Sequence, residues 1–285
     1  MMNGFTVKSL KHRLFMPDED AYQFSHKNLS MAVADGITRD PCYYLPDIRT
    51  FFGKIKWIIK YPSPSPAGAS AGIFVKAFNE FLMRNNLRDS ASIANIFKSA
   101  NERIKEYNAE IGITPISVDF ITKDYAACVA SGIFINEDNM SYGFISDCGV
   151  AIFRPDKNDF AFVSENEGPD KHEKYITAGR NEGGYPDWRE AQARIITRSI
   201  YRNNPSEPHS YGALTGQDEA MYYLTTGNQE LKRGDIVLAY SDGLADIVRH
   251  GSSIDFLREK DFSSLRKYCK KNVRNEGTLV YFVND

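Results

Sequence analysis

The chain has 285 residues with 35 basic and 37 acidic side chains, a formal net charge of −2. This length suits one large domain or two small ones. The near balance of charge gives no global positive field that would attract nucleic acid or an anionic membrane. Met1–Phe15 lacks the continuous apolar core of a secretion signal, and the apolar stretch 125–135 is too short to span a bilayer. We therefore expect a monomeric, cytoplasmic protein with no nucleic-acid or membrane partner.

The cysteines and histidines are scattered along the sequence. No pair of the four cysteines has metal-ligand or C-x-x-C spacing, so we expect free thiols. The five histidines do not cluster, and we interpret them as surface or turn residues. They are His12, His26, His172, His209 and His250.

The first part of the chain predicts short strands followed by two helices. We expect strands within 5–15, at 21–24 and at 29–35, where short β-branched or alternating apolar runs are broken by turn formers. Helices are expected at 69–84 and 89–111, because apolar residues recur there at helical spacing. At the start of the first helix, Gly68 and Gly72 have a small-xxx-small spacing, which we interpret as permitting close helix packing and not as a phosphate-binding loop.

The middle of the chain predicts a β meander and then a long excursion from the core. The expected strands are 126–136, 140–146 and 149–154. Tight polar turns separate them, as in antiparallel hairpins, and Asp147 lies in the second turn. Residues 155–217 are polar and rich in Gly, Pro and Asn, with one helical patch near 188–201.

The last part predicts a return to the core. A strand is expected at 235–241, a helix from Asp242, a basic helix near 263–273 and a final strand at 277–284. Taken in order, the elements indicate an α+β protein in which helices cover antiparallel sheets. No glycine-rich nucleotide-binding loop occurs in the sequence.

Acidic residues stand next to the ends of several predicted strands. Asp35-Gly36 follows the run 31–34, and Asp242-Gly243 follows the run 236–241. Glu19-Asp20 precedes another strand, and Asp147 lies between two. Asp-Gly is also a common turn dipeptide, so spacing alone does not show that these carboxylates meet.

Carboxylates gathered at one place have a defined chemistry. They repel one another and raise each other's pKa unless a cation neutralises them. Sites made only of oxygen select hard ions such as Mg²⁺ or Mn²⁺. Two such ions can clamp a phosphoryl group and activate water.

In chain order, these segments resemble the metal-dependent type-2C serine/threonine protein phosphatases, and more closely a bacterial and archaeal branch of them. The matching segments are Glu19-Asp20-Ala21-Tyr22, Ala32-Val33-Ala34-Asp35-Gly36, Ser146-Asp147-Cys148-Gly149, Ser210–Gly216, Gly234–Asp246 and Thr278-Leu279-Val280. The resemblance implies a four-layer α-β-β-α sandwich, two antiparallel sheets flanked by helices. It also implies one catalytic domain over 1–285, in which the excursion 155–217 corresponds to the family's flap.

The resemblance also implies roles for individual residues. Asp35 would bridge two Mn²⁺ or Mg²⁺ ions, with the Gly36 carbonyl as a further ligand, and Asp242 would bind the first ion. The second ion would be held by Glu19 and Asp20, and a weaker third one would lie near Asp147 and Asp246. The implied reaction is in-line attack of a metal-bridging water on phosphoserine or phosphothreonine in a phosphoprotein substrate.

Three positions depart from the family's pattern. Phe15 stands where the family has an arginine for the substrate phosphate, and Arg13 is the nearest alternative. Asn275 stands where the family has a metal-binding aspartate, and Glu276 follows it as a possible substitute. Ile37 replaces a histidine found in many eukaryotic members.

Three hypotheses remain open on the sequence. The leading one is an active protein phosphatase in which Asp35, Asp242 and Arg13 are catalytic. The departures at Phe15 and Asn275 motivate the second, a pseudophosphatase that binds without turnover. The third is a phosphatase that acts on a small phosphorylated metabolite.

Overall fold

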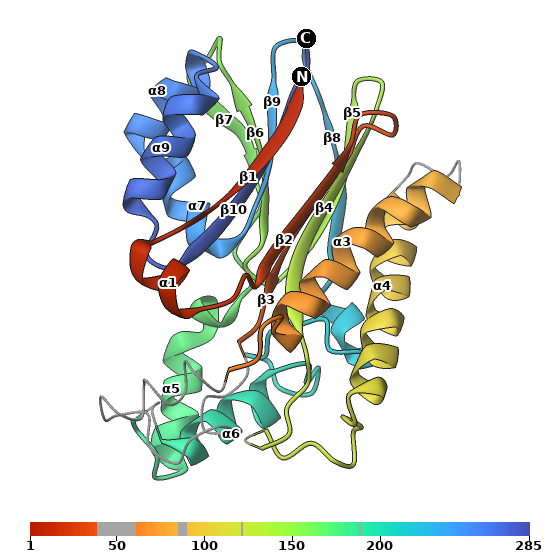
Figure 1. Cartoon of the computed structure of the whole chain (residues 1–285), viewed down its shortest axis with the longest axis vertical. Helices are drawn as coiled ribbons and strands as arrows, with labels where there is room; N and C mark the ends of the chain where they lie inside the picture. Colours follow the sequence, from red (N-terminus) through yellow and green to blue (C-terminus); the bar gives the residue numbers. More distant parts are fainter. Residues whose placement is uncertain (39–60, 85–89, 121, 188–189) are drawn as a thin grey trace.

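The computed structural model describes residues 1–38, 61–84, 90–120, 122–187 and 190–285. Two antiparallel five-stranded sheets lie face to face between two layers of helices (Figure 1). The predicted α+β class and the predicted four-layer sandwich are therefore confirmed.

Each sheet combines strands that are distant in the sequence. In order across the first sheet, the strands are β1 (Met2–Lys8), β10 (Glu276–Val283), β9 (Ile236–Tyr240), β6 (Gly149–Arg154) and β7 (Asp159–Val163). The second sheet consists of β2 (Asp20–Ser25), β3 (Ser30–Gly36), β4 (Cys128–Asn136), β5 (Asn139–Ile145) and β8 (Thr225–Glu230).

The helices cover the outer faces of the sheets. The first sheet is covered by α7 (Asp242–Arg249), α8 (Gly251–Arg258) and α9 (Phe262–Asn272), and the second by α3 (Pro66–Arg84) and α4 (Ser90–Glu110) (Figure 1). Three further helices lie towards one end of the sandwich: α1 (Leu10–Phe15), α5 (Glu173–Glu182) and α6 (Ala191–Tyr201). None of the helices in the described ranges is both long and apolar enough to cross a lipid bilayer.

Strand β3 shows how the core is divided. Met31 and Val33 pack in the apolar layer between the two sheets, and Ala32 and Ala34 pack in the layer under α3 and α4. Both faces of β3 are buried, so the strand is a continuous apolar run without polar alternation. The run ends at the edge of the core with Asp35.

Most of the predicted elements are present with small shifts of their ends. They are β2, β3, α3, α4, β4, β5, β6, α6, β9, α7, α9 and β10. The predicted start of α4 at Asp89 and the first residues of the patch 188–201 lie outside the described residues. The elements β7, α5, β8 and α8 were not predicted.

The prediction of strand over 5–15 is wrong after residue 8. Strand β1 ends at Lys8, and the Ser9 hydroxyl caps α1 by accepting a hydrogen bond of 3.3 Å from the His12 amide. A six-residue helix is too short to show a helical period. Its apolar residues Leu10 and Leu14 are mostly exposed, so they mark no buried face.

The turn that contains Asp147 is not a hairpin turn. Strand β5 pairs with β4 and β8 in one sheet, and β6 pairs with β7 and β9 in the other. The chain therefore crosses between the sheets at Asp147. Ser146 makes the sharp bend with a φ of 69°.

The predicted excursion 155–217 begins later than expected. Residues Asp159–Val163 form β7, the edge strand next to β6. The chain leaves the sheet after Val163 and then forms a short 3₁₀ turn at Pro169–His172, followed by α5 and α6. These helices lie at the end of the sandwich where β3 terminates (Figure 1).

Candidate metal centre

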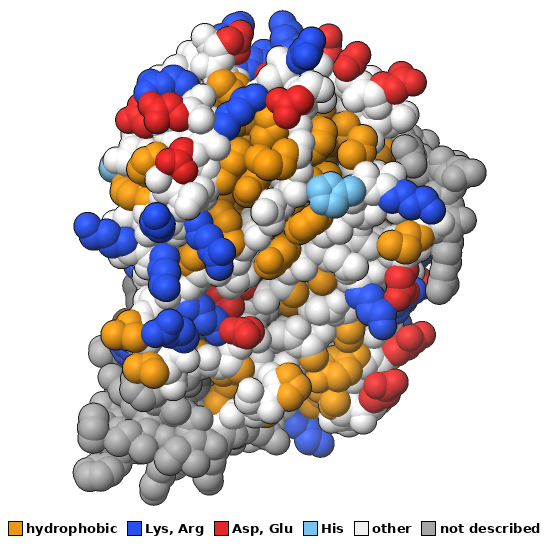
Figure 2. Space-filling model, turned by 45° about the horizontal axis from the view of Figure 1, so that its top comes forward, with side chains coloured by type: hydrophobic (Ala, Val, Ile, Leu, Met, Phe, Trp, Pro, Cys, Tyr) orange, Lys and Arg blue, Asp and Glu red, His pale blue; other side chains and the backbone are white. Residues whose placement is uncertain are grey.

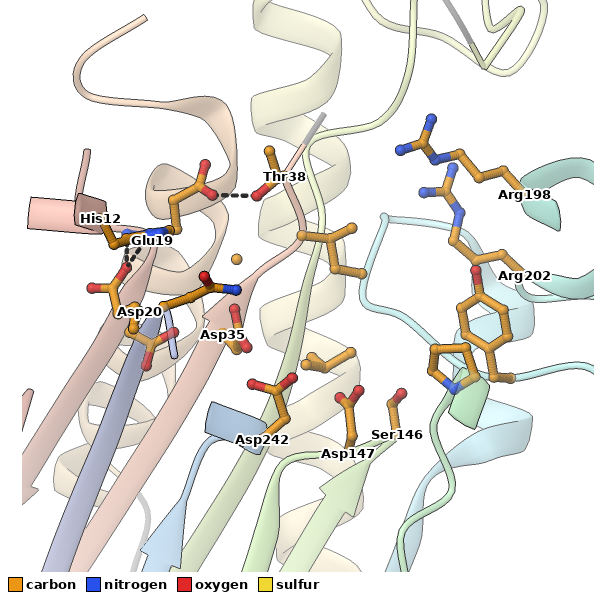
Figure 3. A pocket seen from close by; sticks show the side chains of 17 residues that line it. His12, Glu19, Asp20, Asp35, Thr38, Ser146, Asp147, Arg198, Arg202 and Asp242 are labelled. Atoms are coloured by element: carbon orange, nitrogen blue, oxygen red, sulfur yellow. Dashed lines mark hydrogen bonds and ion pairs between the residues drawn. The ribbon is translucent and has the colours of Figure 1, made fainter. Parts of the chain in front are cut away.

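A pocket of about 310 Å³ lies at this end of the sandwich (Figure 3). Six carboxylates of the described residues line it: Glu19, Asp20, Asp35, Asp147, Asp242 and Glu276. All six were predicted as metal ligands from the sequence, and the fold brings them to one place. They arrive from both sheets, since Asp20 and Asp35 lie on β2 and β3, whereas Glu276 begins β10.

The pairing of β2 with β3 places two acidic residues face to face. Asp20 and Asp35 are direct partners across the antiparallel strands, and like charges in such positions repel. Gly36 follows at the end of β3, and a Cβ there would lie 2.5 Å from the Ala67 carbonyl of α3. The glycine therefore permits close approach of a helix.

Asp242 is presented by the first turn of α7. It follows the buried strand β9, and the next residue, Gly243, packs on the start of β10. A Cβ at Gly243 would lie 1.9 Å from the Glu276 carbonyl oxygen, so only glycine fits. The positive end of α7 favours negative charge at Asp242.

The pKa values of the carboxylates reflect burial and crowding. Burial raises the pKa of Asp20 to about 6, against the opposing effect of a 2.8 Å hydrogen bond from the Ser241 hydroxyl. Burial, and then the charge of Asp242, raise the pKa of Asp147 to about 7. Burial, with Asp20 and Asp242 as neighbours, holds the pKa of Asp35 well above its ordinary value.

Glu19 differs from the other acidic residues because hydroxyl donors already satisfy its carboxylate. Tyr61 and Ser65 donate to Oε1 at 2.6 and 2.8 Å, and Thr38 donates to Oε2 at 2.5 Å. Glu19 thus lines the pocket while both of its oxygens accept hydrogen bonds. A role through water or through positioning suits it better than direct contact with an ion.

Two buried carboxylate oxygens lack partners. Glu276 Oε2 accepts a 3.1 Å hydrogen bond from the Glu19 amide and lies 3.4 Å from Lys8 Nζ. In the described part of the chain, however, neither Glu276 Oε1 nor Asp147 Oδ1 has a hydrogen-bond partner. Burial, and then the charge of Asp20, raise the pKa of Glu276 to about 7. A buried oxygen without a hydrogen-bond partner destabilises the folded protein. A cation bound next to Glu276 Oε1 or Asp147 Oδ1 would therefore stabilise it.

The donor set fits a hard divalent cation, although the side chains are not arranged around one. Within the described residues, no three His, Cys, Asp or Glu side chains form a group that could hold an ion as they stand. Burial, and then the charges of Asp20 and Asp242, raise the pKa of Asp35 and so favour its protonated form when no cation is bound. Protons and metal ions therefore compete for these oxygens.

Three of the predicted site residues lie elsewhere or at the rim. The Asp246 side chain is fully exposed, pairs with Arg249 at 3.2 Å and lines an adjoining hollow. Arg13 is exposed on α1 and lines a different groove. Asn275 does line the pocket, but it is exposed to solvent.

Sequence reasoning missed two arginines on the opposite wall. Arg198 of α6 and Arg202, just after it, face the carboxylates across the pocket (Figure 3). The buried Asp124 holds both, with Oδ1 2.5 Å from Arg202 Nη2 and Oδ2 3.4 Å from Arg198 Nε. Arg198 lies within the predicted helical patch and Arg202 directly after it, so their spacing of four residues was the available signal. The pattern did not indicate which way that helix faces.

His12 also lines the pocket, although the sequence indicated a surface or turn residue. Its Nε2 atom lies 3.8 Å from Glu276 Oε2. Burial and the charge of Lys8 lower the pKa of His12, so its imidazole is mainly neutral at pH 7. It was missed because the helix that carries it was predicted as strand.

The described cysteines are free, as predicted. Cys128, Cys148 and Cys269 are buried thiols. Burial raises the pKa of each, so they are poor nucleophiles at neutral pH. Cys42 lies outside the described residues.

Comparison with solved structures identifies the fold. The chain matches the catalytic domain of the serine/threonine protein phosphatase PstP in complex with two manganese ions, with a TM-score of 0.62 and 14% identity, over 100% of this chain and 98% of that one. It matches a Mycobacterium tuberculosis PstP/Ppp structure with a TM-score of 0.62 and 13% identity, over 100% and 99% of the two chains. For PppA of Pseudomonas aeruginosa the TM-score is 0.58 and the identity 13%, over 99% and 97%. No protein-family model and no curated protein matches the sequence. The sandwich is the fold of the bacterial type-2C serine/threonine phosphatases.

Proposed function

From the type-2C fold as a premise, we propose that the chain is a metal-dependent phosphatase that hydrolyses phosphoserine and phosphothreonine in proteins. The observation that carries this proposal is the convergence of six carboxylates from both sheets on one pocket. Two oxygens of that set are buried and have no hydrogen-bond partner among the described residues, which supports cation binding. PstP, which shares the fold, was solved with two manganese ions, and this supports two Mn²⁺ or Mg²⁺ ions here.

The proposed ligands are the carboxylates that retain oxygens facing the pocket. They are Asp20, Asp35, Asp147, Asp242 and Glu276, with the Gly36 carbonyl. When bound, the ions neutralise these carboxylates and act as Lewis acids on the phosphoryl group and on water. Glu19 supports the set indirectly, because its amide donates to Glu276.

We propose Arg198, in place of the predicted Arg13, as the residue that binds the substrate phosphate. Arg13 lines another groove, whereas Arg198 lines the wall opposite the carboxylates. A guanidinium there can bind phosphate oxygens in a fixed orientation. Asp124 anchors Arg198 and its neighbour Arg202, which limits the motion of this wall.

The test is Mn²⁺-dependent phosphate release from a phosphothreonine peptide. We expect Asp242→Asn to reduce kcat by about 100-fold or more, because it removes a proposed ligand of the ions that would stabilise charge at the reacting group. Asp246→Asn is the matched control, with the same change on the same helix at a fully exposed position. No release from folded wild-type protein, with or without Mn²⁺, would contradict the proposal.

A pseudophosphatase is the second candidate, and Asn275 favours it. An amide is a poorer ligand than a carboxylate, and this one is exposed at the rim of the pocket. If the wild type is inactive, then Phe15→Arg with Asn275→Asp should create activity. Activity in the wild type would exclude this candidate. The remaining alternative is a phosphatase that acts on a small phosphorylated metabolite. It predicts that, in a substrate panel, metabolites are hydrolysed clearly faster than peptides.

A further inference from the structure

A second groove adjoins the carboxylate pocket. It has a volume of about 810 Å³ and lies between α1, the first two strands and α9. Among the described residues, five cationic side chains line it: the mostly buried Lys8 and the exposed Arg13, Arg266, Lys267 and Lys270. Asp20 and Glu276 line both the groove and the pocket, so the two hollows share a wall. Figure 2 shows Lys and Arg side chains gathered on the side of the molecule that carries these helices.

The four exposed cations form no ion pair with any residue that the structure describes. No carboxylate lies within ion-pair distance of any of them in the described part of the chain. Lys8, in the same groove, is different because it is buried and pairs with Asp18 at 2.8 Å and with Glu276 at 3.4 Å. The chain as a whole has a net charge of −2, so this positive field is local.

Helix α9 directs its basic residues to the groove by helical spacing. Arg266, Lys267 and Lys270 lie on one face, while Leu265 and Cys269 pack into the core against the first sheet. The Arg266 guanidinium lies 5.9 Å from the centre of the Phe5 ring, a cation–π contact that orients it. Arg13 joins the groove from α1.

We propose that this groove binds acidic residues that flank the phosphorylated residue of a protein substrate; this rests on the proposed function of the adjoining pocket. A chain with its phosphoresidue in the pocket extends by about 3.3 Å per residue. A few flanking residues are therefore enough to pass the shared wall and enter the groove. Asp and Glu side chains there would pair with the lysines and, in bidentate geometry, with the arginines.

The first arm of the test compares two phosphothreonine peptides that differ only in acidic or neutral flanking residues. We expect the wild type to favour the acidic peptide by about tenfold in kcat/KM at low salt, and less at high salt because the field is screened. Lys270→Glu should remove this ratio. Lys271→Glu is the matched control, an exposed lysine next in the same helix that does not line the groove, and it should leave the ratio unchanged.

The second arm measures binding without turnover, by fluorescence anisotropy of the labelled acidic peptide. Equal kcat/KM values for the two peptides on an active enzyme would contradict the proposed role of the groove and leave the proposed phosphatase function standing. Binding that depends on Lys270, from a protein that hydrolyses nothing, would support the groove and contradict the proposed function. Neither hydrolysis nor binding would overturn both.

Discussion

The pairing of Asp20 with Asp35 lowers the stability of the metal-free protein, while the same two residues are proposed metal ligands. Both are acidic, directly opposite and surrounded by further carboxylates. We expect Asp35→Asn to raise the melting temperature of the metal-free protein by about 2–4 °C, as for a gain of ~1 kcal/mol. The same variant should lose most of the rise caused by Mn²⁺. Thermal denaturation with EDTA and with Mn²⁺ measures both effects.

An exposed carboxylate is the control for this prediction. Asp246→Asn removes the same charge from a side chain that faces solvent. It should change neither the metal-free melting temperature nor the Mn²⁺-dependent rise. If Asp35→Asn lowered the metal-free melting temperature, repulsion would not be the main effect at that position.

The raised pKa values of Asp20 and Asp147 predict opposite pH effects on the metal-free and metal-bound protein. Their pKa values, about 6 and about 7, exceed the ordinary 3.8, so the folded state binds protons more tightly than the unfolded state. Their stabilising contribution is present below about pH 4 and is lost as the pH rises through 6 to 7. With EDTA, unfolding should therefore become easier from pH 5.5 to pH 8.

Metal binding should follow the reverse trend. Deprotonated carboxylates bind cations, so Mn²⁺ affinity should rise over the same pH range, and binding near pH 7 should release protons. Titration calorimetry in buffers of different ionisation enthalpy measures that release. A Mn²⁺ affinity independent of pH would contradict the competition between protons and metal.

Two glycines of α3, Gly68 and Gly72, lie one helical turn apart but have different surroundings. A Cβ at Gly68 would lie 2.4 Å from the Asp18 carbonyl oxygen, while a Cβ at Gly72 would meet nothing within 4 Å. We expect Gly68→Ala to destabilise the protein by about 1–3 kcal/mol through overpacking. Gly72→Ala should stabilise it by about 0.5–1 kcal/mol, because alanine favours helix. Urea denaturation of the pair measures both, and equal effects would contradict this account.

Elements were predictable where apolar residues show a period. Strand β9 is five buried residues before an Asp-Gly pair, and α3 repeats apolar residues over many turns. Strand β8 was missed because it is a polar edge strand with no buried residue. Helix α8 was missed because its eight residues show too little of a helical period.

The site was predictable in its acidic residues and not in its basic ones. Acidic residues such as Asp35 end apolar strands, and the order of the motifs resembled that of a known family. Arg198 could not be placed, because its role depends on how α6 docks on the sandwich. The sequence around Asp147 is compatible both with a hairpin turn and with a connection between the two sheets. Which of the two forms depends on the strands that pair with β5 and β6, and these are distant in the sequence.

At the scale of the whole molecule, bound cations would join the two sheets. The proposed ligands come from β2 and β3 on one side, and from the start of α7 and β10 on the other. A ligand at 100 times its Kd adds about 2.7 kcal/mol to the free energy of unfolding. We expect Mn²⁺ to shift one cooperative urea transition, and to slow hydrogen exchange in both sheets. Protection confined to one sheet would contradict this.

Strand β10 has a consequence for the growing chain on the ribosome. It pairs with β1 on one side and β9 on the other, and its first residue, Glu276, lines the pocket. Residues separated by more than 270 positions must therefore meet before the first sheet closes, which makes folding slow and late. A nascent chain that stops before residue 276 lacks one side of the pocket, so the proposed phosphatase activity would begin only after β10 has been synthesised.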